Sequence, residues 1–439
     1  MLIKSFALPS GTQVDIPHKT GKGNRLTMLL GVNGTQKSTL LRGFLDTALE
    51  QISASTFSPL KGLSQVIYDR PPAGVIALSA IPNDRFPTKS RTSLRVRTRY
   101  EVEEYEYIGP RHNQNIISRN QSLGALVSAA LTNRHRSPSL TRFIGQMSDR
   151  TAIPAQFAVC LRPDMAMGKR GSIFEDFLND EHPSHGKRMD LEFLRSQGLM
   201  DEFRGIFGPG NQKSLIVEID LLTGRCSPEI PLIDIAIRHK LLQVRRSNAR
   251  HERLINPEEY SAGQWGLFSS LVTLALKVRD DALVLIDEPE SALHPSWQRD
   301  YVDCLSHAMA DVSGCHVLLA THSPLLCGSA AAFSSELIVL RRHSVTGELS
   351  AVFEEIPEGW QSNDILERKF ELDSTRGTAF VDKMDNLLKL VALGIERNAR
   401  SIKRLLKDVE PTVAKLPEGD PVRAIFASMQ GLLSKKVDP

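Results

Sequence analysis

The chain has 439 residues, of which 41% are hydrophobic and 24% charged, and its formal net charge is +3. This balance is ordinary for a globular protein with two or three compact units, and it excludes a surface that attracts nucleic acid everywhere. Five scattered cysteines form no Cys-x-x-Cys pair, and no apolar run approaches the ~20 residues of a membrane span. The sequence therefore predicts a cytoplasmic protein with no zinc knuckle, disulfide framework or membrane partner.

The first part of the chain predicts strands around a glycine-containing loop. Alternating apolar residues between positions 2 and 16 predict two strands joined by a turn. Residues 26–30 predict a buried strand, residues 38–49 have helical spacing, and residues 75–78 predict another strand. The loop between the first buried strand and the helix, residues 31–39, reads Gly-Val-Asn-Gly-Thr-Gln-Lys-Ser-Thr. Strand, glycine loop and helix in this order is the context of a phosphate-binding loop.

The middle of the chain has the weakest pattern. Helices are expected near residues 123–131 and 174–177, a strand at 215–220 and a helix at 233–242. There is no sustained heptad repeat, which argues against a long coiled-coil arm. We therefore expect a helical insertion in this part of the chain.

Two apolar runs at residues 282–286 and 317–320 flank a helical pattern at 296–310, and this predicts a βαβ unit with parallel strands. The expected fold is α/β, with a mixed N-terminal sheet, a parallel core sheet and a small all-helical C-terminal region. Helical periodicity at 364–370, 379–393 and 395–409 defines that last region. The expected domain bounds are 1–109, 110–259, 260–356 and 357–439.

The phosphate loop (residues 31–39) is expected to enclose the β-phosphate of a nucleotide with its backbone N–H groups. Lys37 would reach the β- and γ-phosphate oxygens, and the Ser38 hydroxyl would ligate Mg²⁺. Gln36 replaces a glycine of the usual pattern, so we expect nucleotide binding with slow hydrolysis if that position needs a backbone conformation that L-residues avoid. A turn without a ligand is the alternative. The residues expected to contact nucleotide are Asn33, Gly34, Thr35, Gln36, Lys37, Ser38 and Thr39.

The two apolar runs end in polar residues that suit the same chemistry. Asp287 is expected to hold Mg²⁺ together with Ser38, and Glu288 to act as the general base on the attacking water. His322, at the end of the second run, resembles the switch histidine of ABC-type ATPases, and this resemblance implies a hydrogen bond to the γ-phosphate. The alternatives are a helix-capping carboxylate and a structural histidine.

A third element is the serine–glycine segment (residues 260–264), which precedes a helical pattern. A serine hydroxyl and glycine amides at a helix N-terminus form an anion site, and the expected contacts are Ser261, Gly263 and Gln264. Alone, this segment would be weak evidence for such a site.

The phosphate loop, the serine–glycine segment and the polar residues that end the two apolar runs, in this order and spacing, resemble those of ABC-type ATPases of the RecF/SMC-like branch. Residues 76–79, 84–86, 107–109 and 360–366 are similar to ATPase subunits of prokaryotic defence systems, namely Septu and certain retrons. The resemblance implies an ABC-ATPase-like P-loop fold with ATP and Mg²⁺ as cofactors. It also implies a homo-oligomer in which ATP is held between the phosphate loop of one copy and the serine–glycine segment of the next, and a separate effector partner, an HNH-type nuclease.

Three functions remain open at this point. The first is a sensor or scaffold that controls an effector in antiphage defence, the second is a RecF-like DNA-repair ATPase that clamps duplex DNA, and the third is a transporter motor. Basic stretches at residues 91–99 and 245–253 leave nucleic acid open as a ligand. We expect no nuclease activity within the chain, because no Asp-x-Asp pair for two-metal cleavage follows Ser323.

Overall fold

The structure is a computed structural model, and it divides the chain into two compact units, Met1–Trp360 and Gln361–Pro439, each considered by itself below. The residues that it describes are 2–8, 10–17, 23–52, 66–88, 100, 102–113, 116–117, 119–163, 167–168, 171–179, 185–207, 214–229, 232–239, 241–245, 252–327, 333–343, 345–354, 356, 360, 363–365, 374 and 376–437.

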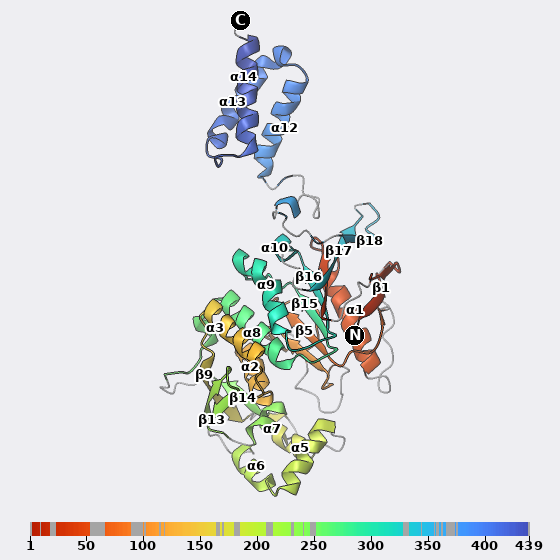
Figure 1. Ribbon diagram of the computed structural model, residues 1–439, viewed down its shortest axis with the longest axis vertical. Helices are drawn as coiled ribbons and strands as arrows, with labels where there is room; N and C mark the ends of the chain where they lie inside the picture. Colours follow the sequence, from red (N-terminus) through yellow and green to blue (C-terminus); the bar gives the residue numbers. More distant parts are fainter. Residues whose placement is uncertain are drawn as a thin grey trace. The chain divides into compact units, whose positions relative to one another are not determined.

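A seven-stranded sheet forms the core of the first unit (Figure 1). Neighbouring strands are parallel except at one edge, where β17 and β18 are antiparallel. Four strands are buried along their whole length, as expected of parallel strands covered on both faces. The strands predicted at 26–30, 75–78, 282–286 and 317–320 are thereby confirmed. The order is β18 (Leu349–Glu354), β17 (Ser334–Arg342), β3 (Arg25–Leu30), β16 (His316–Thr321), β15 (Leu283–Asp287), β5 (Val75–Ser79) and β6 (Tyr105–Ile108).

Helix α1 (Lys37–Ile52) covers one face of this sheet, whereas α8 (Ala262–Lys277) and α9 (Pro295–Ala308) lie on the other side (Figure 1). A small antiparallel sheet of β2 (Gln13–Asp15), β1 (Ile3–Ala7) and β4 (Val66–Tyr68) shares the α1 core. Phe6 of β1 meets Phe44 of α1 edge to face, with ring centroids 5.2 Å apart. The predicted N-terminal strand pair and the predicted helix over 38–49 are confirmed. Burial of this helix on both sides fixes the element that carries the phosphate loop.

A buried polar cluster ties four strands together at the end of the sheet remote from the phosphate loop. Arg25 donates to Glu336 at 3.3 Å, and the Thr27 hydroxyl donates to the same carboxylate at 3.3 Å. His316 contacts the Thr27 hydroxyl at 2.9 Å through Nε2 and accepts from the Ile3 amide at 3.1 Å through Nδ1. Because buried polar groups are costly unless paired, this cluster specifies the order of β1, β3, β16 and β17.

The middle of the chain contains helices and an antiparallel sheet in the order β13 (Arg225–Ser227), β12 (Leu215–Asp220), β9 (Gln156–Pro163) and β14 (Leu242–Arg245). The helices predicted near 123–131 and 174–177 and the strand at 215–220 are confirmed, but a helical insertion is an incomplete description. The helix predicted over 233–242 is wrong at its end, since α7 stops at Arg238 and Leu242 already belongs to β14, which pairs with β9. The helices are α2 (Arg119–Thr132), α3 (Pro138–Thr151), α4 (Ile173–Leu178), α5 (His185–Ser196), α6 (Met200–Phe207) and α7 (Ile233–Arg238).

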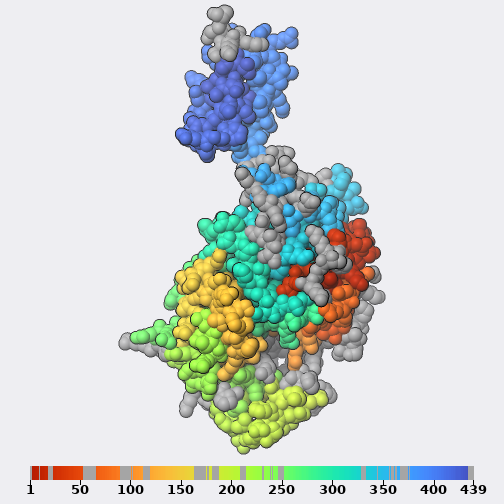
Figure 2. Space-filling view, viewed as in Figure 1, coloured from red at the N-terminus to blue at the C-terminus, as the bar shows by residue number. Residues whose placement is uncertain are grey.

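Helices α2 and α3 pack against α8, and α3 also contacts α9. In Figure 2 their yellow atoms form one continuous surface with the green atoms of the following core helices. The insertion is therefore joined to the core next to the serine–glycine segment. The remaining short elements of this unit are β7 (Arg111–Asn113), β8 (Ile116–Ile117), β10 (Met167–Gly168), β11 (Gly171–Ser172), α10 (Pro324–Cys327) and a single 3-10 turn, Pro257–Glu259.

In the described part of the second unit, α12 (Thr378–Ala392), α13 (Ile395–Val413) and α14 (Pro421–Val437) pack around a core of their own. The helices predicted at 379–393 and 395–409 are confirmed, whereas most of the helix predicted at 364–370 lies outside the described residues. All five cysteines are buried, and none of them forms a disulfide. Within the part of the chain that the structure describes, no helix is both long and apolar enough to cross a bilayer.

Two adjacent leucines of α12 test whether this core holds the second unit together. Leu387 is fully buried and Leu388 is 44% exposed. Leu387→Ala should lower the opening free energy of α13 amides in hydrogen exchange by about 2–5 kcal/mol, because it leaves a cavity. Leu388→Ala changes the same residue type in the same helix and should have little effect. Equal protection in both variants would contradict this packing.

Candidate nucleotide-binding site

The register of the parallel strands brings the predicted site residues to one edge of the sheet. Thr321 pairs with Leu30, and Asp287 pairs with Ala320. The strands β3, β15 and β16 therefore end at the same edge of the sheet. The phosphate loop follows β3, Glu288 follows β15 and His322 follows β16. This is the carboxyl edge, where open α/β sheets bind their ligands.

The phosphate loop is held in shape by its own backbone and by β17. The Thr35 hydroxyl donates to the Val32 carbonyl at 2.8 Å, so it points into the loop. Gly31 has no room for a side chain, because a Cβ there would lie 2.6 Å from the Thr35 hydroxyl and 2.9 Å from the Leu340 carbonyl. Gly34 has a φ of 87°, which glycine adopts without strain.

Lys37 is buried at the start of α1, and its ammonium donates to the carbonyls of Gly31 at 2.7 Å and Val32 at 3.3 Å. Burial lowers the pKa of Lys37, while the carboxylates of Glu288, Glu290 and Asp287 oppose that shift. The ammonium thus lies within the field of three acidic groups, and a phosphate would offer it a stronger partner than two carbonyls.

A pocket of about 260 Å³ opens beside this lysine. It contains six of the seven loop residues predicted to contact nucleotide, with Thr35 the exception, and it adds Glu288. It also adds Arg85, which sequence reasoning did not assign to the site. Among the described residues, the lining consists of Asn33, Gly34, Gln36, Lys37, Ser38, Thr39, Arg85 and Glu288.

Gln36 has a φ of 61°, in the left-handed region that non-glycine residues avoid. From the sequence, we link slow hydrolysis to a backbone conformation at this position that L-residues avoid. The structure has that conformation, which glycine adopts freely. A second strained residue, Glu288 with a φ of 46°, lines the same pocket. Such strain is typical of functional sites and persists only where the surrounding structure enforces it.

Asp287 ends β15 with its carboxylate buried, and neither oxygen accepts a hydrogen bond from the described residues. Burial raises the pKa of Asp287 to about 7, and the Ser38 side chain lies close enough to offset part of that rise. A buried carboxylate without donors, next to a serine hydroxyl, is a donor set that fits a divalent cation. Asp287 and Ser38 therefore fit Mg²⁺.

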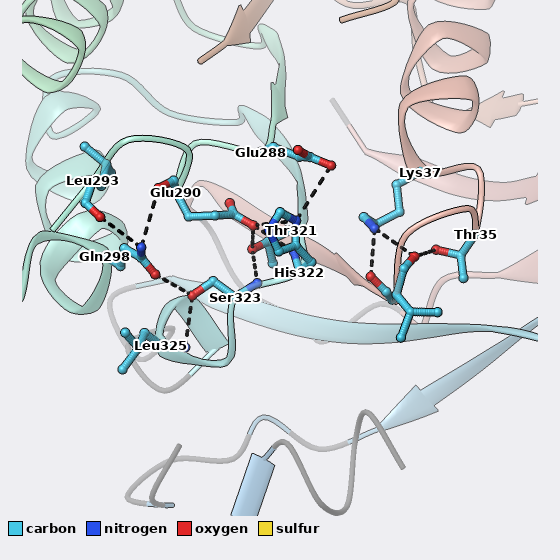
Figure 3. A network of polar contacts seen from close by, with 12 residues as sticks. Thr35, Lys37, Glu288, Glu290, Leu293, Gln298, Thr321, His322, Ser323 and Leu325 are labelled. Carbon is cyan, nitrogen blue, oxygen red and sulfur yellow. Dashed lines mark hydrogen bonds and ion pairs between the residues drawn. The ribbon is translucent and has the colours of Figure 1, made fainter. Parts of the chain in front are cut away.

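Glu288 and His322 follow neighbouring strands, and Figure 3 shows a contact between their side chains. Glu288 lines the pocket, whereas His322 is not among the described residues that line it. Nδ1 of His322 is 3.7 Å from a Glu288 oxygen and 3.3 Å from a Glu290 oxygen. The Glu288 amide donates to the Ala320 carbonyl at 3.0 Å, which fixes its backbone to β16. The two predicted catalytic side chains are thus brought together, with Glu290 as a third member that the sequence did not indicate.

The serine–glycine segment forms a capped helix start. Ser261 accepts from the Gln264 amide at 3.1 Å, and the Gln264 side chain accepts from the Ser261 amide at 2.9 Å, which is a capping box. Gln264 also donates to the Thr151 carbonyl at 3.1 Å, so its side chain is engaged within the chain. A Cβ on Gly263 would lie 2.5 Å from the Ala292 carbonyl. Nucleotide contact by these three residues remains a prediction, since none of them lines the pocket of the same copy.

Two residues of α2 hold this segment in place. Arg119 donates to the carbonyls of Pro257 at 2.9 Å and Tyr260 at 2.7 Å. The Trp265 indole donates to the Ser122 hydroxyl at 2.6 Å. The insertion thereby sets the position of the helix start, a role that has no local signature in the sequence.

A buried network sets the position of Arg85. Asp84 accepts from the Tyr107 hydroxyl at 2.7 Å and from Arg111 Nε at 3.2 Å. The Arg85 carbonyl in turn accepts from Arg42 of α1 at 2.8 Å. The separate sequence strings 84–86 and 107–109 are therefore parts of one support for the pocket wall.

Comparisons with known proteins match part of this chain. A family model described as "AAA domain, putative AbiEii toxin, Type IV TA system" matches residues 175–328, which include α8, β15, β16 and His322. Septu protein PtuA of Bacillus thuringiensis is 29% identical over 121 residues. That alignment covers 26% of this chain and 28% of PtuA, so the chain spans well under two thirds of its curated relative.

Solved structures similar to this chain include SMC head domains. The head bound to the C-winged helix domain of ScpA is 14% identical, with 81% of this chain and 98% of that chain covered and a TM-score of 0.30. The SMC head domain from Thermotoga maritima is 13% identical, with 81% and 100% covered and a TM-score of 0.32.

The left-handed backbone at Gln36 predicts an unusual order of stability. At most helix-start positions alanine is more stabilising than glycine, but here Gln36→Gly should be more stable than Gln36→Ala by about 0.5–1 kcal/mol. Chemical denaturation of the two variants measures the difference, and Gln36→Ala is the control because it removes the same side chain while keeping Cβ. A more stable alanine variant would contradict the strained conformation.

The buried Asp287 predicts a pH dependence of the nucleotide-free protein in a chelator. A pKa raised in the folded state means that the unfolded chain loses this proton first, so stability should fall as pH rises from about 4 to about 7 and then level off. Asp287→Asn should remove that fall and be the more stable protein at pH 8 by more than about 1 kcal/mol. Asp15→Asn changes an exposed carboxylate on β2 and serves as control. Parallel pH profiles for Asp287→Asn and the wild type would refute the assignment.

Proposed function

We propose that this chain, part of which resembles an AAA domain family and the Septu protein PtuA, is an ABC-type ATPase that binds ATP and Mg²⁺ between two copies of itself and thereby controls a separate effector. The observation that carries this proposal is the division of the site. The pocket beside Lys37 is built from the phosphate loop, Arg85 and Glu288, while the capped helix start at Ser261 is exposed and lines no part of it. In the proposed assembly, these two halves come from different copies and complete each other across an interface.

In the proposed site, the loop amides and Lys37 bind the phosphates, and Arg85 lies at the pocket wall to add a second positive charge. Ser38 and Asp287 hold Mg²⁺, which when bound supplies positive charge against the phosphate oxygens. Glu288 accepts the proton of the attacking water, and His322 donates to the γ-phosphate. The 3.7 Å between His322 Nδ1 and a Glu288 oxygen supports a shared reaction centre for the two groups.

The second half of the site is proposed to come from α8 of the neighbouring copy. Its helix is 16 residues long, its first turn carries no acidic residue, and its N-terminal cap is exposed. The positive end of the helix dipole and the free amides of the first turn favour an anion there. A γ-phosphate protruding from the pocket of one copy has the charge that this helix start accepts.

We propose that hydrolysis is slow, because the strained residue Gln36 takes the place of the last glycine in the loop. A side chain at this position restricts how the loop adapts to the transition state. Gln36→Gly should therefore raise kcat in addition to its effect on stability.

Control of an effector in antiphage defence is proposed from the resemblance to PtuA, with an HNH-type nuclease as the partner class. The second unit has a core of its own, which does not include the nucleotide site. We therefore propose it as the module on which the effector docks. Clamping of duplex DNA is a second candidate, favoured by exposed cations on α13. They are Arg397, Arg400, Lys403, Arg404 and Lys407. A salt-sensitive, ATP-dependent shift of duplex DNA by the purified protein would favour this candidate over effector control.

If ATP is shared between two copies, dimer formation should require nucleotide. It should also depend on the charge at Ser261, the cap of α8. Glu288→Gln should retain ATP and sediment as a dimer with ATP and Mg²⁺, but not without nucleotide. In that background Ser261→Asp should prevent dimer formation, because it places a carboxylate against the neighbour's γ-phosphate.

Ser261→Asn is the matched control, since asparagine and aspartate are equally good N-caps and differ here in charge alone. It should still form the dimer. Dimers of equal affinity in the asparagine and aspartate variants, or sedimentation of Glu288→Gln that ATP leaves unchanged, would rule out a site shared between copies.

A further inference from the structure

Glu290 is a buried carboxylate that the proposed chemistry leaves without a role. It lies in the turn after β15, and its side chain is 4% exposed. One oxygen, Oε1, accepts from the Thr321 hydroxyl at 2.7 Å and from the His322 amide at 2.8 Å. The same oxygen is 3.3 Å from Nδ1 of His322, and Figure 3 shows these contacts converging on it.

A buried carboxylate at this position lowers the stability of the fold unless its charge is compensated. Its second oxygen, Oε2, is buried and has no hydrogen-bond partner among the described residues. Burial of a charged group is unfavourable when its lone pairs are left unsatisfied. For packing alone, an apolar or amide side chain would therefore give a more stable fold. The charge contacts the hydroxyl of Thr321 and the backbone amide and ring of His322, the two residues at the end of β16.

The turn that carries Glu290 is fixed on two sides. Gln298 of α9 donates to the Leu293 carbonyl at 3.0 Å and accepts from the Ser323 hydroxyl at 2.8 Å, which is a second link between the segments after β15 and β16. On the other side, the Ala292 carbonyl lies against Gly263 of α8. Glu290 therefore stands on a rigid support, as a residue that orients another one requires.

We propose that Glu290 is a positioning residue that holds His322 beside Glu288. Its hydrogen bond to the backbone amide fixes where the histidine leaves β16, and its oxygen lies 3.3 Å from Nδ1, which is buried and has no hydrogen-bond partner among the described residues. Nε2, on the opposite side of the ring, is left for the ligand, as in sites where a second group orients a functional histidine. This inference rests on the proposed role of His322 toward the γ-phosphate, and it also sets the distance from His322 to Glu288.

The kinetic test uses Glu290→Ala and Glu290→Gln in the full chain. Glu290→Ala should lower kcat by about tenfold or more with KM little changed, and Glu290→Gln, which keeps an acceptor but no charge, should be intermediate. If Glu290 acts through His322, adding Glu290→Ala to His322→Ala should cause no further loss. Losses that multiply in the double variant would overturn the inference.

The control is Glu336→Gln, which changes another buried carboxylate, paired with Arg25 and Thr27 far from the pocket. It should lower the melting temperature without lowering kcat, which separates positioning from general destabilisation. A loss of kcat in Glu336→Gln equal to that in Glu290→Gln would overturn the inference.

A spectroscopic readout keeps this inference separate from the proposed function. In the nucleotide-free protein, the side-chain resonance of His322, assigned with His322→Asn among the 12 histidines, should shift or broaden in Glu290→Ala and not in Glu336→Gln. An unchanged His322 resonance would refute positioning even if the wild type hydrolyses ATP. Wild-type protein without ATP turnover would instead refute the proposed function, and the resonance would still decide the role of Glu290.

Discussion

The parallel pairing of β3, β16 and β15 is the constraint on which the rest of the molecule depends. Its register places Thr321 beside Leu30 and Asp287 beside Ala320, so three loops distant in sequence begin at one edge of the sheet. Because the strands are buried on both faces, a shift in register would displace every group at that edge together. The lysine, the two carboxylates and the histidine owe their proximity to backbone hydrogen bonds rather than to contacts with one another.

Two kinds of feature at this site are unfavourable for the free energy of folding. Asp287, Glu290 and Lys37 are ionisable side chains removed from solvent, and Gln36 and Glu288 have left-handed backbones. Each feature is unfavourable alone and is maintained by the surrounding sheet and helices. A bound phosphate and a divalent cation would satisfy the lysine and Asp287 together, so ligand binding and the stability of this edge are coupled.

Much of this arrangement follows from sequence because its determinants are local. Apolar runs of strand length, the glycine loop before α1 and the acidic residues at the end of β15 each have a pattern within a few residues. The predicted insertion failed where the determinant is remote, since β14 and β9 pair across about 80 residues. Glu290, Arg85 and Arg119 were missed for the same reason. Their partners are His322, the pocket wall and the carbonyls before α8, which only the folded chain brings close.

The central claim is that one triphosphate joins two copies of this chain. An experimental structure of the Glu288→Gln protein with ATP and Mg²⁺ tests this most directly. The account predicts that Lys37 of one copy and the Ser261 helix start of another contact the same γ-phosphate, with Ser38 and Asp287 at the cation. A nucleotide enclosed by residues of one copy alone, with the α8 N-terminus directed elsewhere in every assembly, would contradict it.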